Sequence, residues 1–258
     1  MRPQRDALTA TDWDVLVILD ACRADSFQAL VPEAESVESE SIGTIQWIRD
    51  HHDIFVQRNA IYFTAMIPVK GWNLRHAHPL EVVPVCDWCW GKHTAAALPA
   101  LHPEAMNGAV LTYLKTHRLH KRPVIVHYGQ PHVPLIGAPH IAAFPNKAYT
   151  GLKLGAASMC WVWKQAVEGV IEWAELRAAY EANVALVWRS VQNLLRHMKG
   201  TAVITADHGT VFDEHGPRAR GHGHSARYPE QQIVPWHVMQ CGQNPVTKAE
   251  QLEALGYL

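Results

Sequence analysis

Two short runs of consecutive apolar residues, each ending at an acidic residue, stand out in the hydrophobic pattern of the chain. One is Val15–Leu19, which is followed by Asp20, and the other is Thr201–Ala206, which is followed by Asp207 and His208. Continuous apolar runs rich in β-branched residues are typical of strands buried on both faces of a parallel sheet. Ligands in such sheets bind at the carboxyl ends of the strands. The pattern therefore predicts that Asp20 and Asp207 meet at one edge of the sheet.

Apolar residues that recur every three or four positions predict helices between the strands. The clearest stripe lies in Ile171–Met198, directly before the second apolar run. Shorter helices are expected at Ala21–Leu30, His102–Thr116, Ala156–Trp173 and Thr247–Leu255, further strands at Val124–Tyr128, Ile233–Val238 and within Ile54–Ala65, and an acidic loop at Glu33–Glu40. The alternation of strand, helix and strand indicates an α/β fold with a large, mostly parallel sheet sandwiched between helices.

The chain is long enough for a full core, because it has 258 residues and 48% of them are hydrophobic. Two stretches, at about 68–101 and about 137–175, lack a clear period and are rich in Trp, Pro, Gly or Ala. We expect one domain over residues 1–258, with these two stretches as irregular excursions from it.

Charge and apolar length exclude several classes of partner. The formal net charge is −1, from 23 basic and 24 acidic residues. The chain therefore has no net positive charge to attract nucleic acid or an anionic membrane surface. No segment reaches the roughly 18 uninterrupted apolar residues of a membrane span, and no signal-peptide core is recognisable near the N-terminus. The expectation is a soluble, cytoplasmic protein.

The five cysteines form an odd, scattered set that does not resemble a secreted disulfide framework. Cys86 and Cys89 have the spacing of half a structural zinc or redox site, but no second cysteine pair lies nearby.

The sequence Asp207-His208-Gly209 favours metal chemistry at the end of the second apolar run. A carboxylate and an imidazole supply oxygen and nitrogen ligands for a divalent cation, and glycine allows the backbone to turn away. Asp20 would add a third ligand from the neighbouring strand. The alternative is a solvated strand-end turn without a ligand.

A hydroxyl group for nucleophilic attack is available at Thr44, which precedes an apolar, helical segment, and Ser41 lies three residues earlier. An ordinary helix N-cap is the alternative for either residue. A divalent cation beside the hydroxyl would stabilise the alkoxide, so the nucleophile would need no adjacent histidine base.

Four further residues are candidates for contacts with the substrate or the metal. Arg23 follows the first strand and would help to hold an oxyanion, unless it makes only a surface salt bridge. His132 follows the strand at Val124–Tyr128 between two prolines, and its alternative is a structural role. His222 and His224 lie in a glycine-rich loop that could reach a metal or a leaving oxygen, or could be a plain surface loop.

The order of these parts resembles the alkaline phosphatase superfamily, in particular its sulfatase-like branch. The similarity runs from about Trp13 to Val238 and is strongest in VLVILDACRADSF, HYGQPHVP and ITADHGTVFDEHG. The resemblance implies an alkaline phosphatase-like sheet with metal at the strand ends. It also implies a metal-bound hydroxyl nucleophile.

Carried over residue by residue, the resemblance implies that Asp20, Asp207 and His208 are metal ligands and that Thr44 is both nucleophile and ligand. His132 matches a histidine that contacts the transferred group or the leaving oxygen. His222 matches a position that binds a second ion in two-metal members.

Three departures from the family pattern refine the interpretation. The Cys-x-Pro-x-Arg context of formylglycine sulfatases is missing around Ser41–Thr44, which disfavours sulfatase activity. Tyr128 stands where two-metal phosphatases have an Asp four residues before the histidine, and Asp20 lacks the second aspartate of sulfatases. One ion, Mn²⁺ or Zn²⁺, is therefore expected, with a second ion uncertain.

The sequence thus leads to one principal hypothesis and two alternatives. The principal one is a metal-dependent hydrolase or transferase that acts on a phosphodiester or phosphomonoester, in a small molecule or a polymer, through Thr44. The alternatives are a sulfate or phosphonate ester hydrolase, and a catalytically inactive binding protein of the same fold.

Overall fold

The computed structural model describes residues 1–66, 69, 80–85, 101–117, 122–138, 141, 161–216 and 228–242. The strands in these ranges form one seven-stranded sheet in the order β2-β7-β6-β1-β5-β3-β4. Their bounds are β1 Val15–Asp20, β2 Glu35–Glu38, β3 Ile61–Thr64, β4 Glu81–Pro84, β5 Val124–Pro131, β6 Thr201–Ala206 and β7 Ile233–Gln240.

The centre of the sheet is parallel and its β2 side is antiparallel. β1 lies between β5 and β6 and runs parallel to both, and β3 runs parallel to β5 and β4. β7 is antiparallel to β6 and to β2. All six residues of β1 are buried, as expected for a strand covered on both faces. The predicted mostly parallel α/β sheet is confirmed.

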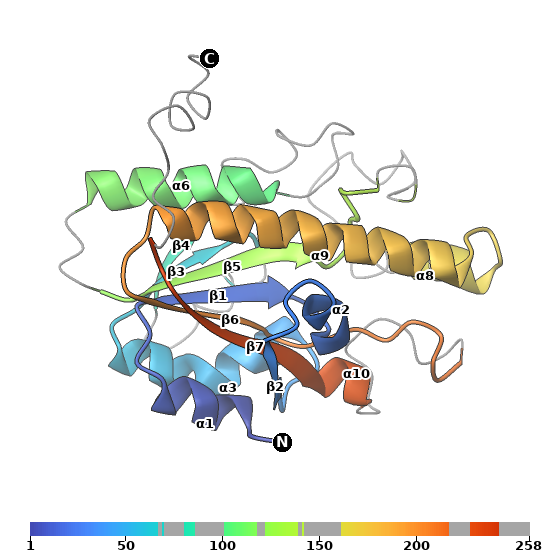
Figure 1. The fold of residues 1–258 in the computed structure, drawn as a ribbon, viewed down its shortest axis with the longest axis horizontal. Helices are drawn as coiled ribbons and strands as arrows, with labels where there is room; N and C mark the ends of the chain where they lie inside the picture. The colour runs from blue at the N-terminus through green and yellow to red at the C-terminus, as the bar shows by residue number, and fades with distance from the viewer. Residues whose placement is uncertain are drawn as a thin grey trace, which may run out of the picture.

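Helices cover both faces of the sheet (Figure 1). α6 (Pro103–Thr116) and α9 (Trp173–Arg196) lie on one face, and α1 (Gln4–Ala10) and α3 (Thr44–Gln57) lie on the other. α9 buries the predicted apolar stripe, including Val184, Val187 and Val191, against the sheet. The shorter helices are α2 (Ala24–Gln28), α8 (Trp161–Val167) and α10 (Pro229–Gln232).

Four local predictions need correction. The acidic segment at Glu33–Glu40 contains the edge strand β2, in which Val37 is buried and the glutamates at both ends are exposed. The stretch Ile54–Ala65, predicted to contain one or two strands, contains β3 as predicted, but its first four residues are the end of α3. Trp47, Ile48, His51, Ile54 and Phe55 fall on one buried face of that helix. α2 starts at Ala24 instead of Ala21, and β4 lies within the excursion predicted at 68–101.

Several predictions concern residues outside the described ranges. They are the helix at Thr247–Leu255, the cysteine pair Cys86 and Cys89, and the histidines His222 and His224. Over the ranges that the structure describes, no helix combines the length and the hydropathy needed to span a membrane.

Candidate metal centre

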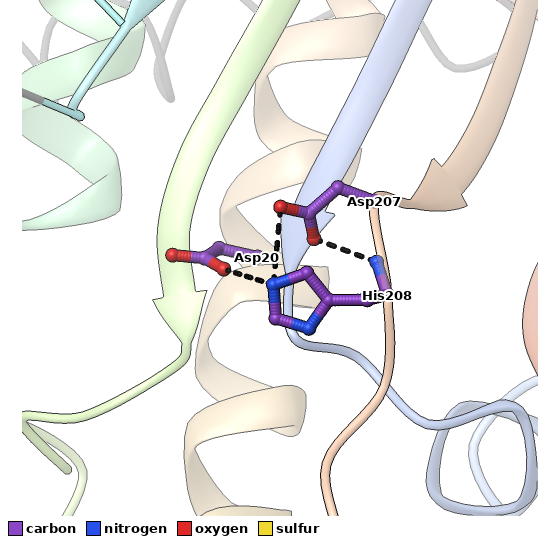
Figure 2. Close-up of side chains that lie close together, drawn as sticks. All are labelled: Asp20, Asp207 and His208. Carbon is purple, nitrogen blue, oxygen red and sulfur yellow. Dashed lines mark hydrogen bonds and ion pairs between the residues drawn. The ribbon is translucent and has the colours of Figure 1, made fainter. Parts of the chain in front are cut away.

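The carboxyl ends of β1 and β6 bring three potential metal ligands together (Figure 2). Leu19 of β1 is paired with Ala206 of β6, so the residues that follow them, Asp20 and Asp207, lie side by side. The Nε2 atom of His208 lies 3.6 Å from Oδ1 of Asp20 and 3.5 Å from Oδ2 of Asp207. One ligand atom from each residue lies within 4.8 Å of the others, and all three residues are buried. The predicted convergence of these side chains is confirmed.

Within the described ranges, three hydrogen bonds hold Asp207. Its Oδ1 accepts from the backbone N–H groups of Ala21 and His208, at 3.1 and 2.9 Å, and its Oδ2 accepts from the Thr44 hydroxyl at 2.7 Å. Burial acts to raise the pKa of Asp207, but His208, His127 and these hydrogen bonds bring it below its ordinary value. Asp207 is therefore a preorganised carboxylate that stays ionised.

Asp20 has no comparable hydrogen-bond donors among the described residues. Both of its carboxylate oxygens are buried, and neither accepts a hydrogen bond from any of the described residues. Burial, and next the charge of Asp207, raise the pKa of Asp20 well above its ordinary value. A buried carboxylate without a donor is costly. A divalent cation bound by Asp20, Asp207 and His208 would supply the missing positive charge, so the residues fit such an ion.

The orientation of His208 is set by Gly209. Nδ1 of His208 lies 2.8 Å from the Gly209 carbonyl oxygen, and because a carbonyl only accepts, Nδ1 carries the hydrogen. In the neutral ring, Nε2 then directs its lone pair toward the two carboxylates, as a metal-ligating histidine requires.

Gly209 itself is needed for a close approach. Its N–H donates to the Gln231 carbonyl at 2.7 Å, and a Cβ at this position would lie 2.0 Å from the Glu230 carbonyl oxygen. The glycine thus lets the segment after β6 pack directly on α10.

Thr44, not Ser41, has its hydroxyl at the centre. Thr44 is the first residue of α3, and the N-cap position belongs to Gly43, so the hydroxyl of Thr44 is not the helix cap. Ser41 is fully buried and donates to Asp50 Oδ2 at 2.8 Å. Of the two candidate nucleophiles, Thr44 is the one that contacts a potential metal ligand.

His132 follows β5 and lies at the edge of the same site. Its backbone N–H donates to the Asp20 carbonyl at 3.0 Å, and its Nδ1 lies 2.8 Å from the Val133 carbonyl. Burial lowers the pKa of His132 to about 4, the Val133 hydrogen bond opposes this shift, and the nearby charges of His208 and Asp207 also contribute. His132 is therefore neutral near pH 7.

Arg23 forms salt bridges, which is the alternative that the sequence offered, but they are made by a buried side chain and not at the surface. Its guanidinium makes two hydrogen bonds to Asp25, at 2.9 and 2.7 Å, and others to Glu214 at 2.6 Å and the Thr210 carbonyl at 3.2 Å. The residue is 5% exposed. Its donors are engaged by the protein, so the structure favours a link between the loops after β1 and β6 over direct contact with an oxyanion.

Sequence reasoning missed His127 and Tyr62. His127 lies near the end of β5, fully buried, with Nε2 3.7 Å from Asp207 Oδ2, and its Nδ1 is 2.7 Å from the Tyr62 hydroxyl. The available signal was a histidine inside the otherwise apolar strand predicted at Val124–Tyr128.

Comparison with known proteins gives structural matches only. The chain matches no protein-family model and no curated protein sequence. It superimposes on the soluble domain of lipooligosaccharide phosphoethanolamine transferase A from Neisseria meningitidis with a TM-score of 0.55 and 14% identity, covering 89% of this chain and 76% of that domain. The chain spans about half, 49%, of the integral membrane form of the same transferase.

Two further solved structures also superimpose on this chain. A putative sulfatase from Bacteroides thetaiotaomicron has a TM-score of 0.54 at 12% identity, with 95% of this chain and 70% of that chain covered. The zinc complex of the C-terminal periplasmic domain of EptC from Escherichia coli has a TM-score of 0.52 at 10% identity, with 93% and 74% covered. The chain therefore has the alkaline phosphatase-like fold that these transferase and sulfatase structures share, and it carries a candidate metal site at the strand ends.

Proposed function

We propose that this protein is a metal-dependent enzyme that hydrolyses or transfers a phosphoester group through Thr44. The observation that carries the proposal is the 2.7 Å hydrogen bond from the Thr44 hydroxyl to Asp207 Oδ2, beside the buried cluster of Asp20, Asp207 and His208. It joins a nucleophile to a potential metal ligand inside a fold that phosphoethanolamine transferases share.

The metal site is proposed to consist of Asp20, Asp207 and His208, with the Thr44 hydroxyl beside them. This set of oxygen and nitrogen donors suits Zn²⁺ or Mn²⁺, and the zinc complex of the E. coli EptC domain supports Zn²⁺. A bound divalent cation would supply Lewis-acid chemistry, lowering the pKa of the adjacent hydroxyl and offsetting the negative charge of a phosphoryl group.

The chain's own groups can carry out a two-step transfer. Thr44 releases its hydroxyl proton to solvent, and its oxygen forms a bond to phosphorus while the bond from phosphorus to the leaving oxygen breaks; the leaving oxygen takes up a proton from solvent. In the second step, water or an acceptor alcohol attacks phosphorus, the bond to the Thr44 oxygen breaks, and the hydroxyl is restored. The outcome is hydrolysis with water and transfer with an alcohol.

His132 is proposed to act as a base in the second step. Its Nδ1 hydrogen is held by the Val133 carbonyl and the ring is neutral near pH 7, so Nε2 is an acceptor. A neutral acceptor takes a proton from the incoming water or alcohol more readily than it protonates the leaving oxygen.

The decisive experiment combines metal analysis with trapping of the covalent intermediate. We expect the purified protein to bind one Zn²⁺ or Mn²⁺ and to turn over an aryl phosphate or phosphodiester. Thr44→Ala should reduce turnover by several orders of magnitude because the covalent route is lost, and Thr44→Ser should keep much of it. Acid quench and mass spectrometry should find phosphate on the peptide that contains Thr44.

Ser41→Ala is the matched control, since it removes a hydroxyl three residues away that contacts Asp50 instead of Asp207. It should keep near-parent turnover. Phosphate on Ser41, or near-parent turnover by Thr44→Ala, would place the nucleophile elsewhere. Faster turnover of an aryl sulfate or phosphonate would favour the alternative ester classes, and a protein without bound metal or turnover would support an inactive binding protein.

A further inference from the structure

A buried chain of three side chains approaches the candidate metal site from the side of β3. Tyr62 in β3 contacts His127 in the neighbouring strand β5, with its hydroxyl 2.7 Å from Nδ1. Nε2 of His127 lies 3.7 Å from Asp207 Oδ2, the oxygen that also accepts from Thr44. All three residues of the chain are fully buried. The arrangement therefore connects the sheet interior to the carboxylate oxygen that is closest to the nucleophile.

The Tyr62 hydroxyl defines where the imidazole proton lies. Burial, and next the Asp207 and Asp20 carboxylates, raise the pKa of Tyr62 well above its ordinary value, so the hydroxyl keeps its proton. In the described part of the chain, this hydroxyl has Nδ1 of His127 as its hydrogen-bond partner. A buried hydroxyl donor needs an acceptor, so Nδ1 must offer its lone pair and Nε2 must carry the ring hydrogen.

The environment of Nε2 leads to the same tautomer independently. This nitrogen faces Oδ2 of Asp207, which accepts the hydrogen of the Thr44 hydroxyl and therefore offers His127 an acceptor and not a donor. With Nδ1 occupied as the acceptor of the Tyr62 hydroxyl, the ring hydrogen lies on Nε2, which faces Oδ2 of Asp207.

We propose that Tyr62 and His127 form a positioning pair for Asp207, in which the Nε2–H of His127 holds Oδ2 toward the metal and the Thr44 hydroxyl. The proposal rests on the metal-dependent function proposed above. At 3.7 Å the Nε2–H is beyond hydrogen-bond distance in this structure, but its partial positive charge acts on Oδ2 across a buried, low-dielectric gap.

The same tautomer makes His127 a positioning residue and not a metal ligand. A nitrogen that carries hydrogen has no lone pair to give to a cation. Among the described residues, the group whose ligand atoms lie within 4.8 Å of one another contains Asp20, Asp207 and His208 but not His127. The pair therefore acts on the metal only through the Asp207 carboxylate.

Two substitutions of His127, to Asn and to Gln, distinguish the contribution of Nδ1 from that of Nε2. The amide nitrogen of Gln reaches about where Nε2 lies, and that of Asn reaches about where Nδ1 lies. His127→Asn should weaken Zn²⁺ binding about 10- to 100-fold, the usual effect of losing a group that orients a ligand. His127→Gln should stay within a few-fold of the parent. Tyr62→Phe, which releases the ring, should fall between them.

Tyr128→Phe is the matched control for loss of a buried hydroxyl. Tyr128 lies in β5 beside His127, is fully buried, and donates to Asn107 Oδ1 at 2.6 Å instead of to a group at the site. We expect it to lower the melting temperature of the metal-free protein while leaving the Zn²⁺ dissociation constant unchanged. A merely structural role for Tyr62 would give the same result as this control.

The measurements are Zn²⁺ titration against a chromophoric chelator, thermal unfolding of the metal-free protein, and ¹⁵N NMR of the imidazoles. In the NMR spectrum of the metal-free parent, the His127 signals, identified by their loss in His127→Gln, should show hydrogen on Nε2. Hydrogen on Nδ1, or equal Zn²⁺ affinity for the Asn and Gln variants, would overturn the proposal. If the parent binds no Zn²⁺, the proposed function fails and the pair loses its role with it. If the parent and all variants bind Zn²⁺ equally, only the positioning pair is refuted.

Discussion

The ends of β1 and β6 carry two carboxylates that are equally buried but differently supported. Asp207 accepts three hydrogen bonds, from Ala21, His208 and Thr44, whereas Asp20 accepts none from the described residues. Burial acts to raise the pKa of Asp207, but nearby histidines and hydrogen bonds lower it below its ordinary value. For Asp20, burial and the charge of Asp207 both raise the pKa. One carboxylate is thus organised by the protein itself, and the other is the one that a bound cation would stabilise more.

Asp25, five residues after Asp20, shows what a cation does for a carboxylate in this region. Arg23 makes two hydrogen bonds to Asp25, and Arg177 makes a third at 3.0 Å. Burial acts to raise the pKa of Asp25, but Arg23 and Arg177, together with the Ser26 backbone, lower it to about 2. Among the described residues, no guanidinium donates to Asp20 in this way, which supports Asp20 as a ligand for a divalent cation.

The largest expected effect follows from removing the organised carboxylate. Asp207→Ala should abolish stoichiometric metal binding and turnover, because the change removes a ligand and the acceptor of the Thr44 hydroxyl. Metal content of the purified variant and its activity on an aryl phosphate would measure this, with circular dichroism to check that it folds. Stoichiometric metal in the variant would refute the assignment of Asp207 as a ligand.

Substitution of Asp20 should have a smaller effect on metal affinity, and it should not destabilise the metal-free protein. Asp20→Asn keeps one oxygen donor, so metal affinity should fall less than in Asp207→Ala. In the metal-free protein the same change should leave the free energy of unfolding unchanged or raise it by about 1 kcal/mol, because it removes a buried acid that accepts no hydrogen bond from the described residues. Urea unfolding in chelator would measure this. A metal-free variant less stable than the parent would mean that Asp20 has stabilising contacts of its own.

The smallest effect concerns Asp25 and acid stability. Its folded pKa of about 2 lies below the unfolded value of 3.8, so its contribution to stability is present above pH 3.8 and is lost as pH falls through 2. Because the side chain is 51% exposed, we expect at most about 1 kcal/mol. Urea unfolding between pH 5 and 2 should show a flatter acid decline for Asp25→Asn, and an unchanged decline would argue against the ion pair with Arg23.

The parts of the fold that could be predicted are those in which one strong pattern spans an element. The continuous apolar runs of β1 and β6 and the long stripe of α9 leave little choice of structure. β2 was mistaken for a loop because four residues with three polar side chains carry almost no periodic signal, and it forms only by pairing with β7. Tertiary pairing of this kind is invisible in a local sequence pattern.

The candidate metal site likewise has residues whose positions could be predicted from the sequence and residues whose positions could not. Asp20, Asp207 and His208 follow apolar strands directly, so strand register brings them together as predicted. The environment of Arg23 was not predictable, because it depends on Glu214 and Thr210, almost two hundred residues away in the sequence. The position of His127 depends on a contact with Tyr62 from another strand. Roles that depend on contacts between residues far apart in the sequence could not be derived from the spacing of residues within a motif.

Two of the three donors to Asp207 are backbone amides, those of Ala21 and His208. A substitution can replace a side-chain donor, but only proline removes a backbone N–H. The orientation of this carboxylate can therefore be inherited through the path of the chain while the residues around it drift. Distant homologues of the site are best sought by the geometry of two adjacent strand ends, since sequence identity can fall to the level of chance without disturbing those amides.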